Sequence, residues 1–234
     1  MSMRAMILAA GRGERMRPLT DAAPKPLLSI GGRRLIEWHL LGLARAGFVD
    51  IVINLAWLGS QIRDALGDGS RHGVRIVYSD EGSTALETGG GIFRALPRLG
   101  PEPFLVVNGD IWTDFDFRRL PQLDAAAHAA LVLVPNPPQH PRGDFNLAAA
   151  ADGRLRDVNE SGTGPRYTFS GIAVYRPAFF AGCTDGKFPL LPLLRRAIAA
   201  DTLRGEPYAG LWYDIGTPER LRELDQRLAD GAVG

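Results

Sequence analysis

The sequence has a single cysteine, Cys183, among its 234 residues. One thiol excludes an internal disulfide framework and any zinc site built from several cysteines. It also fits a reducing compartment, so the sequence predicts a cytoplasmic protein. Four histidines are present without the spacing of metal ligands, which argues against a transition-metal site: His39, His72, His128 and His140.

Excess charge of one sign and long hydrophobic runs are also missing. Lys and Arg total 27 against 26 Asp and Glu, so the composition predicts neither a nucleic-acid-binding surface nor attachment to an acidic membrane. The apolar run over residues 6–10 is shorter than the core of a signal peptide or a membrane span. Any polyanion bound here is therefore expected to be a small molecule. Nothing in the sequence indicates an obligatory protein partner.

The sequence does have an alternation of short apolar runs and helical patterns. The runs predict strands over residues 4–10, 51–55, 74–78 and 104–108. Between them, apolar residues recur at helical spacing at Ile36, Leu40 and Leu43 and at Leu58, Ile62 and Leu66. We therefore predict an α/β fold, with a Rossmann-like, mixed but mostly parallel sheet flanked by helices.

The second half changes in character. Strand-like runs over residues 130–134, 146–149 and 168–175 are joined by Pro and Gly clusters, which predicts antiparallel additions to the sheet. Helices are predicted over 190–200 and 218–228, with a short strand over 212–215 between them. No repeat or linker divides the chain, so we predict one domain over 1–234, although the length alone would also allow two small domains.

A glycine-containing loop, Gly11-Arg12-Gly13-Glu14-Arg15, directly follows the first strand. Glycines admit positive φ and let backbone N–H groups approach an anion, so the loop is predicted to hold phosphate. A dinucleotide fingerprint would need a third glycine where Met16 stands, and a Walker loop would need Gly-Lys followed by Ser or Thr. An ordinary tight turn is the alternative interpretation.

Basic residues surround this loop. Arg12, Arg15, Arg17 and Lys25 all lie between residues 12 and 25. Lys25 stands between two prolines, which disfavour a helix and predict a stiff loop that aims the lysine. Any one of these residues could be solvated surface. Together they favour binding of a triphosphate.

Residues 8–18, Leu-Ala-Ala-Gly-Arg-Gly-Glu-Arg-Met-Arg-Pro, and residues 24–27, Pro-Lys-Pro-Leu, resemble the signature of the sugar nucleotidyltransferases, also called nucleotide-sugar pyrophosphorylases. The resemblance implies the nucleotide-diphospho-sugar transferase fold, with a nucleotide-binding half over about 1–115 and a sugar-binding half over about 116–234. It implies that the glycine loop wraps the triphosphate, that Arg15 steadies the departing phosphates, and that Lys25 contacts the phosphates at the reaction centre.

Two strands carry aspartates at their ends. Asp110 follows the run 104–108 at the edge where ligands bind in open α/β sheets, and Asp214 is embedded in the last strand. Asp110 alone could be a capping or turn residue. Asp214, a lone acid in an apolar strand, needs a partner because an unpaired buried charge is costly. The resemblance implies that this pair holds Mg²⁺ beside the triphosphate, since that ion prefers carboxylate and phosphate oxygens. Asp114 and Asp116 are expected to cap or flank the following helix.

The run Glu87-Thr88-Gly89-Gly90-Gly91 is predicted to form a loop that opens a helix and admits a ring, with a flexible turn as the alternative. The resemblance implies that this loop contacts the nucleobase, whose identity the residue types leave open. The predicted nucleotide-binding residues are Ala10, Gly11, Arg12, Gly13, Asn54, Thr88, Gly89 and Asn108.

Sugar recognition needs hydroxyl and amide partners, and the resemblance points to the regions around Gly143, Asp144 and Asn146 and to Glu160. A hairpin turn and a solvated loop acid are the alternatives there. The resemblance also implies a direct, Mg²⁺-dependent displacement, in which the sugar phosphate attacks the α-phosphorus and pyrophosphate leaves.

The runs over 108–114, 143–145 and 87–91 most resemble family members that join UTP to N-acetylmuramic acid 1-phosphate in bacterial cell-wall recycling. The alternative within the family is a guanylyl- or thymidylyltransferase acting on mannose, heptose or glucose 1-phosphate. A non-catalytic nucleotide-sugar sensor and a nicotinamide-dependent dehydrogenase are rivals from other classes. The joint presence of Arg15, Lys25, Asp110 and Asp214 favours an enzyme over the sensor. The dehydrogenase is disfavoured by Met16 at the third glycine position and by the lysine between two prolines.

Overall fold

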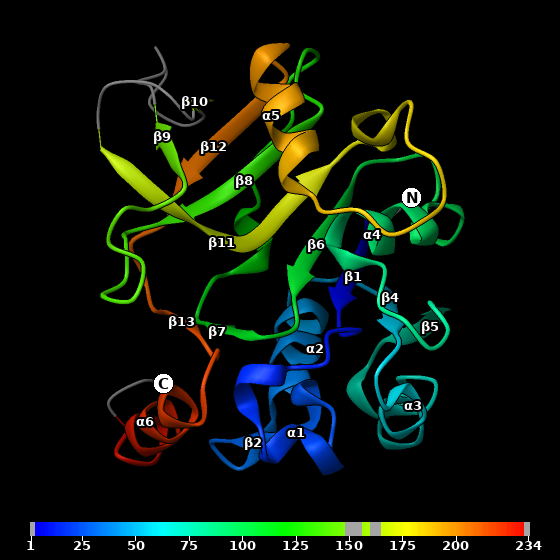
Figure 1. Cartoon of the computed structure of the whole chain (residues 1–234), viewed down its shortest axis with the longest axis vertical. Helices are drawn as coiled ribbons and strands as arrows, with labels where there is room; N and C mark the ends of the chain where they lie inside the picture. The colour runs from blue at the N-terminus through cyan, green and yellow to red at the C-terminus, as the bar shows by residue number, and fades with distance from the viewer. Residues whose placement is uncertain (1–2, 148–155, 160–164, 232–234) are drawn as a thin grey trace.

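The computed structural model describes residues 3–147, 156–159 and 165–231. Within these residues a nine-stranded sheet has the order β5-β4-β1-β6-β11-β8-β12-β10-β9, with β5 and β9 at its opposite ends (Figure 1). Its strands are β1 (Arg4–Leu8), β4 (Asp50–Leu55), β5 (Arg75–Asp80), β6 (Phe104–Asn108), β8 (Ala129–Val134), β9 (Phe145–Leu147), β10 (Arg156–Asn159), β11 (Arg166–Tyr175) and β12 (Leu203–Pro207).

The first four strands of this order form the parallel part of the sheet, because β1 pairs in parallel with β4 and β6, and β4 pairs in parallel with β5. The side chains of β1, β4 and β6 are largely buried on both faces, whereas the edge strand β5 exposes Arg75, Val77 and Asp80. On β1, Ala5 and Ile7 belong to one core cluster and Met6 belongs to the other. Near-continuous apolar runs are typical of strands that are covered on both sides, which explains why the sequence pattern located them.

Helices cover both faces. The longer ones are α2 (Leu35–Arg45), α3 (Gly59–Leu66), α4 (Glu87–Leu99), α5 (Leu191–Ala199) and α6 (Pro218–Ala229). Apolar side chains of α2 and α3 pack in one core cluster, and those of α4 and α5 pack in the other. Leu58 was expected inside the second helix, but it precedes α3 with φ of +50°. The predicted fold class, a mostly parallel sheet flanked by helices, is confirmed.

The second half adds strands of mixed direction. β11 is antiparallel to both β6 and β8, and β12 pairs with β8 in parallel. The predicted antiparallel additions are thus correct for β11. The sequence pattern missed β12 because its residues, Leu-Arg-Gly-Glu-Pro, include only one large apolar side chain. It also missed β10, which pairs with β12 and β9.

A smaller unit joins the end of the chain to its beginning. β13 (Trp212–Asp214) pairs antiparallel with β7 (Ile111–Thr113), and β2 (Ser29–Ile30) pairs with β3 (Arg33–Arg34). A third core cluster connects them to α6: Met16, Ile30, Leu35, Trp112, Ile215, Leu221 and Leu224. The remaining helical turns are α1 (Leu19–Ala22) and the 3₁₀ turns η1 (Glu14–Met16), η2 (Lys25–Leu27), η3 (Ser70–His72), η4 (Phe117–Arg119) and η5 (Pro177–Phe180).

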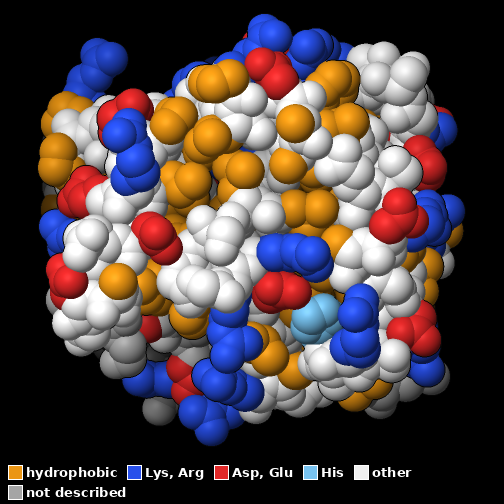
Figure 2. Space-filling model, turned by 90° about the horizontal axis from the view of Figure 1, so that it is seen from below, with side chains coloured by type: hydrophobic (Ala, Val, Ile, Leu, Met, Phe, Trp, Pro, Cys, Tyr) orange, Lys and Arg blue, Asp and Glu red, His pale blue; other side chains and the backbone are white. Residues whose placement is uncertain are grey.

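The surface carries both signs of charge. Figure 2 shows the molecule from below the view of Figure 1, and Lys and Arg side chains lie interspersed with Asp and Glu on this face. None of the helices in the described part of the chain combines the length and the apolar character that crossing a membrane requires.

Candidate active site

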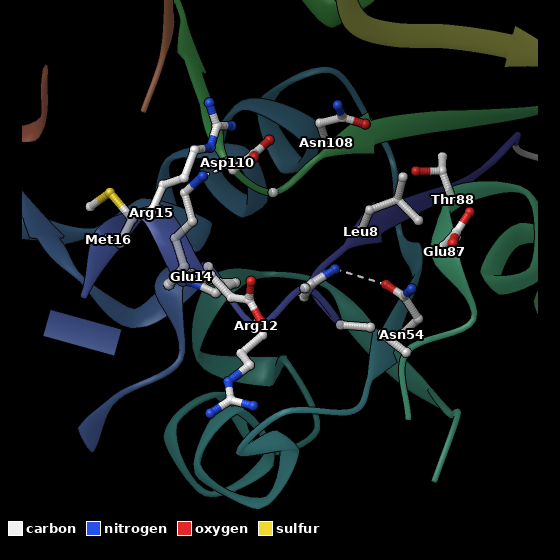
Figure 3. Close-up of a pocket in the computed structure, with 18 of the residues that line it drawn as sticks. Leu8, Arg12, Glu14, Arg15, Met16, Asn54, Glu87, Thr88, Asn108 and Asp110 are labelled. Carbon is white, nitrogen blue, oxygen red and sulfur yellow. Dashed lines mark hydrogen bonds and ion pairs between the residues drawn. The ribbon is translucent and has the colours of Figure 1, made fainter. Parts of the chain in front are cut away.

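A cavity of about 520 Å³ opens at the carboxyl ends of β1, β4 and β6 (Figure 3). We call it the loop cavity. It is lined by residues 8–16 and by Lys25, Pro26, Asn54, Glu81, Ala85, Glu87, Thr88, Asn108, Gly109, Asp110 and Gly216. Most of the predicted nucleotide-binding residues line it, namely Ala10, Gly11, Arg12, Gly13, Asn54, Thr88 and Asn108, and so do Arg15 and Lys25.

The two glycines of the loop have different surroundings. Gly13 has φ of +65°, and a Cβ there would lie 3.1 Å from Cγ2 of Thr20 and 3.3 Å from Cβ of Lys25. Thr20 also donates a hydrogen bond from its hydroxyl to the carbonyl of Gly13 at 2.8 Å. A Cβ on Gly11 would meet no atom within 4 Å. Gly13 therefore shapes the loop, whereas Gly11 leaves open space for a ligand.

The three arginines in or next to the loop, Arg12, Arg15 and Arg17, have different surroundings. Arg15 is exposed and lies with Asp110 on one side of the cavity, across from Leu8, Asn54 and Thr88 (Figure 3). The guanidinium of Arg12 lies over the ring of Trp57, 4.5 Å from its centroid, a favourable cation–π geometry. Arg17 pairs with Asp21 at 2.7 Å and does not line the loop cavity.

Lys25 is buried, unlike Arg12 and Arg15, which also line the loop cavity. It is only 7% exposed, and its Nζ lies 2.8 Å from Oδ2 of Asp110. A buried lysine needs such a partner, since removing an unpaired charge from water is costly. A helical conformation was not expected at this position. The residues Lys25–Leu27 nevertheless form the 3₁₀ turn η2, because Pro26 occupies its second position, where no backbone N–H is needed.

Glu81 is a site residue that the sequence analysis missed. Its side chain is 5% exposed, accepts from Nδ2 of Asn54 at 2.7 Å through one oxygen, and accepts from the backbone N–H of Leu86 at 2.7 Å through the other. Asn54 in turn accepts from the N–H of Ala9 at 2.7 Å (Figure 3). This relay ties the end of β1 to the segment before α4. The available signal was an acid directly after β5, but that strand ends in Ser79 and Asp80, and such a polar ending also describes an ordinary turn.

The predicted glycine loop is part of a helix. Gly89, Gly90 and Gly91 lie within α4 and are buried. A Cβ on Gly89 would lie 2.6 Å from the ring of Phe188, and one on Gly90 would lie 2.2 Å from the carbonyl oxygen of Gly186. The glycines thus allow close protein packing, and Gly89 does not line the loop cavity, whereas Thr88 does.

A second cavity of about 250 Å³, which we call the aspartate cavity, shares Asn108 and Asp110 with the loop cavity. Asp214 also lines it. The two aspartates, far apart in sequence, are brought together by the pairing of β7 with β13, and the N–H of Ile215 donates to the carbonyl of Asp110 at 3.0 Å. Asp214 is paired with Arg220 and Asp110 with Lys25, so a cation faces each carboxylate.

The aspartate cavity contains oxygen ligands of the kind that Mg²⁺ accepts. No cluster of three His, Cys, Asp or Glu side chains able to hold a metal occurs among the described residues. Two carboxylates suit Mg²⁺, which binds through one or two carboxylates together with substrate phosphates and water. Asp116 caps η4 through the N–H of Arg118, as expected. Asp114 does not cap it, because it accepts from Tyr208 and from the N–H of Leu211.

The predicted sugar-binding residues do not lie in one cavity. Asp144 lines the aspartate cavity, where Oδ1 contacts Nε2 of His140 at 2.9 Å and Oδ2 accepts from the N–H of Phe169 at 2.8 Å. Gly143 lines a third cavity. Asn146 is buried, lines none of the three cavities, and accepts from Arg166 at 3.2 Å. Glu160 lies outside the described residues.

The chain is similar to known proteins over nearly its whole length. The chain is 54% identical to N-acetylmuramate alpha-1-phosphate uridylyltransferase of Neisseria meningitidis serogroup B, over 97% of this chain and 98% of that one. It is 35% identical to the protein of the same name from Caulobacter vibrioides, over 97% of each chain. A Bacillus anthracis protein solved in complex with sucrose has the same fold, with a TM-score of 0.80, 21% identity, and coverage of 98% of this chain and 96% of that one. The family described as Nucleotidyl transferase matches residues 4–231. The chain therefore belongs to the nucleotidyl transferase family, as the signature in its first residues predicted.

Proposed function

We propose that this chain transfers the uridylyl group of UTP to N-acetylmuramic acid α-1-phosphate, in bacterial cell-wall recycling. The observation that carries the proposal is the 54% identity over nearly the whole length of a relative with that name. The second relative, at 35% identity, carries the same name. The loop cavity and the aspartate cavity, which meet at Asp110, offer adjoining places for a nucleotide and a sugar phosphate.

The proposed reaction is a direct displacement. An oxygen of the sugar phosphate forms a bond to the α-phosphorus of UTP, the bond from that phosphorus to the bridging oxygen breaks, and pyrophosphate leaves with the electron pair. The attacking oxygen is already anionic, so no general base is required. The protein's task is then to position the reactants and stabilise charge. The loop around Gly11 and Gly13 holds the triphosphate, Arg15 contacts the departing phosphates, and Lys25 lies at the reaction centre.

We further propose that Mg²⁺ is required and that Asp110 and Asp214 hold it. Both carboxylates line the aspartate cavity, and Asp110 also lines the loop cavity where the phosphates would lie. When bound, the ion would offset the negative charge of the phosphates. Lys25 and Arg220 keep the two carboxylates oriented toward this region through their ion pairs.

A matrix of nucleoside triphosphates against sugar 1-phosphates, read by pyrophosphate release, tests the proposal. We expect the highest kcat/KM for UTP with N-acetylmuramic acid 1-phosphate, and loss of turnover when a chelator removes Mg²⁺. A preference for GTP or dTTP with mannose, heptose or glucose 1-phosphate would contradict the proposed substrates. Full turnover in the chelator would contradict the proposed metal.

A further inference from the structure

A third cavity of about 700 Å³ lies beside the aspartate cavity, and we call it the arginine cavity. It is lined by Asn136, His140, Pro141, Arg142, Gly143 and Arg166. His140 lines both cavities, so it forms the wall between them. A ligand whose phosphate lies at Asp110 could therefore extend past His140 into this space.

The loop that carries Arg142 is rigidly held. Nε of Arg166 donates to the carbonyl of Arg142 at 2.9 Å, and another of its nitrogens donates to the carbonyl of Asp144 at 2.9 Å. Nδ2 of Asn136 donates to the carbonyl of Pro141 at 3.2 Å. With these carbonyls bonded to neighbouring side chains, the loop has little freedom to lose when a ligand binds.

The two arginines of this cavity differ in the hydrogen-bond partners of their guanidinium groups. Arg166 donates hydrogen bonds to two backbone carbonyls of the loop and to the side chain of Asn146. Arg142 is exposed, and no partner for its guanidinium occurs in the described part of the chain. The nearby carboxylate of Asp144 is bonded to His140 and to the N–H of Phe169. Among the described residues that line this cavity, Arg142 thus has a guanidinium available to an anion.

We propose that Arg142 binds the carboxylate of the lactyl group on the muramic acid ring and sets the preference for this acidic sugar. The inference rests on the proposed function. A guanidinium can bind a carboxylate through two parallel hydrogen bonds, a geometry that lysine does not reproduce. N-acetylglucosamine 1-phosphate differs from the proposed substrate by lacking the lactyl ether, so it has no group for Arg142 to hold.

The test compares Arg142→Met with the unchanged chain on both sugar phosphates, with UTP as the donor. For the muramic acid substrate we expect kcat/KM to fall roughly 10- to 100-fold, mainly through KM, as for other hydrogen bonds between charged groups. For N-acetylglucosamine 1-phosphate, kcat/KM should stay within about twofold of the unchanged chain, and KM for UTP should not move. Arg45→Met is the matched control, because Arg45 is exposed at the end of α2 and lines none of the three cavities.

The outcomes separate the two proposals. If the unchanged chain prefers the muramic acid substrate and Arg142→Met keeps that preference, the assignment of Arg142 is wrong while the proposed function stands. If the unchanged chain does not use the muramic acid substrate with UTP, the proposed function fails and the assignment fails with it. Equal loss on both sugars, with a lowered melting temperature, would assign Arg142 a structural role and overturn the inference.

Discussion

Individual side chains at this site act through neighbours that come from other parts of the chain. Lys25 meets Asp110 and Glu81 meets Asn54, partners that lie far apart in sequence, whereas Asp214 meets the nearby Arg220. A charged group that is held in place before the substrate arrives needs no reorganisation during the reaction, which is why such contacts contribute strongly to catalysis. The site can therefore be tested one contact at a time.

The first test concerns Lys25. Replacing it with methionine keeps the aliphatic packing against Gly13 but removes the charge next to Asp110. We expect kcat to fall roughly 10²- to 10³-fold, as for other preorganised electrostatic contacts, with an unchanged circular dichroism spectrum. Arg17→Met removes a cation that lies outside the loop cavity and should leave kcat unchanged. Unaltered turnover in Lys25→Met would show that the lysine has no role in the reaction.

Glu81 should matter for both stability and nucleotide binding. Glu81→Ala leaves the buried amide of Asn54 and the N–H of Leu86 without their acceptor. We expect the free energy of unfolding in urea to fall by about 2–6 kcal/mol, since each of the two unsatisfied donors costs about 1–3 kcal/mol. KM for UTP should rise, because the ends of β1 and β5 would no longer be tied together. Glu102→Ala, at an exposed position, is the control.

At the scale of elements, the glycines of α4 and Gly11 of the loop after β1 have different structural roles. Those in α4 let a helix approach Phe188 and Gly186, whereas Gly11 keeps a cavity open. The same residue type in a short run therefore indicates packing in one element and ligand space in the other. Sequence spacing does not separate these uses, because both produce the same pattern of small residues.

A pair of alanine substitutions distinguishes them. Gly90→Ala places a Cβ 2.2 Å from the carbonyl oxygen of Gly186, so we expect a loss of about 1–3 kcal/mol in unfolding free energy from overpacking. Gly11→Ala meets no atom within 4 Å and should change stability by less than about 0.5 kcal/mol. Its methyl group enters the loop cavity, so KM for UTP should rise. Thermal unfolding and steady-state kinetics measure both effects, and the reverse pattern would refute this assignment of the two glycines.

For the whole molecule, the buried His39 on α2 makes stability depend on pH. Burial lowers its pKa from 6.5 to about 4. The unfolded chain therefore takes up a proton below pH 6.5 that the folded chain takes up only near pH 4. Stability from this residue is fully present above pH 6.5 and is lost as the pH falls to 4, by about 3 kcal/mol at 1.36 kcal/mol per unit. We expect His39→Leu to flatten the unfolding free energy between pH 6.5 and 4, measured by urea titration. An unchanged pH profile would show that His39 is not the group responsible.

Local patterns in the sequence were sufficient for the parallel strands, the helices and the loop around Gly13. Those features depend on side-chain periodicity and on the conformational freedom of glycine, both of which act over a few residues. The signature in residues 8–18 also identified the family, and the stiff segment at Lys25 pointed to the residue that meets Asp110. The exact strand ends and the polar strand β12 were not predictable, because β12 is held by its pairing with β8 and not by its own side chains.

Long-range pairing decided the rest. Asp214 lies beside Asp110 only because β13 pairs with β7, and Glu81 became a site residue only because β4 and β5 end side by side. The glycines of α4 pack against Phe188 and Gly186, so their use depends on a segment about a hundred residues away. Arg166 is likewise distinguished from Arg142 by hydrogen bonds that it donates from β11 to the carbonyls of Arg142 and Asp144 in a distant loop. Residue types and spacing carry no information about such partners, since contacts between distant segments exist only once the core has brought the strands and helices together.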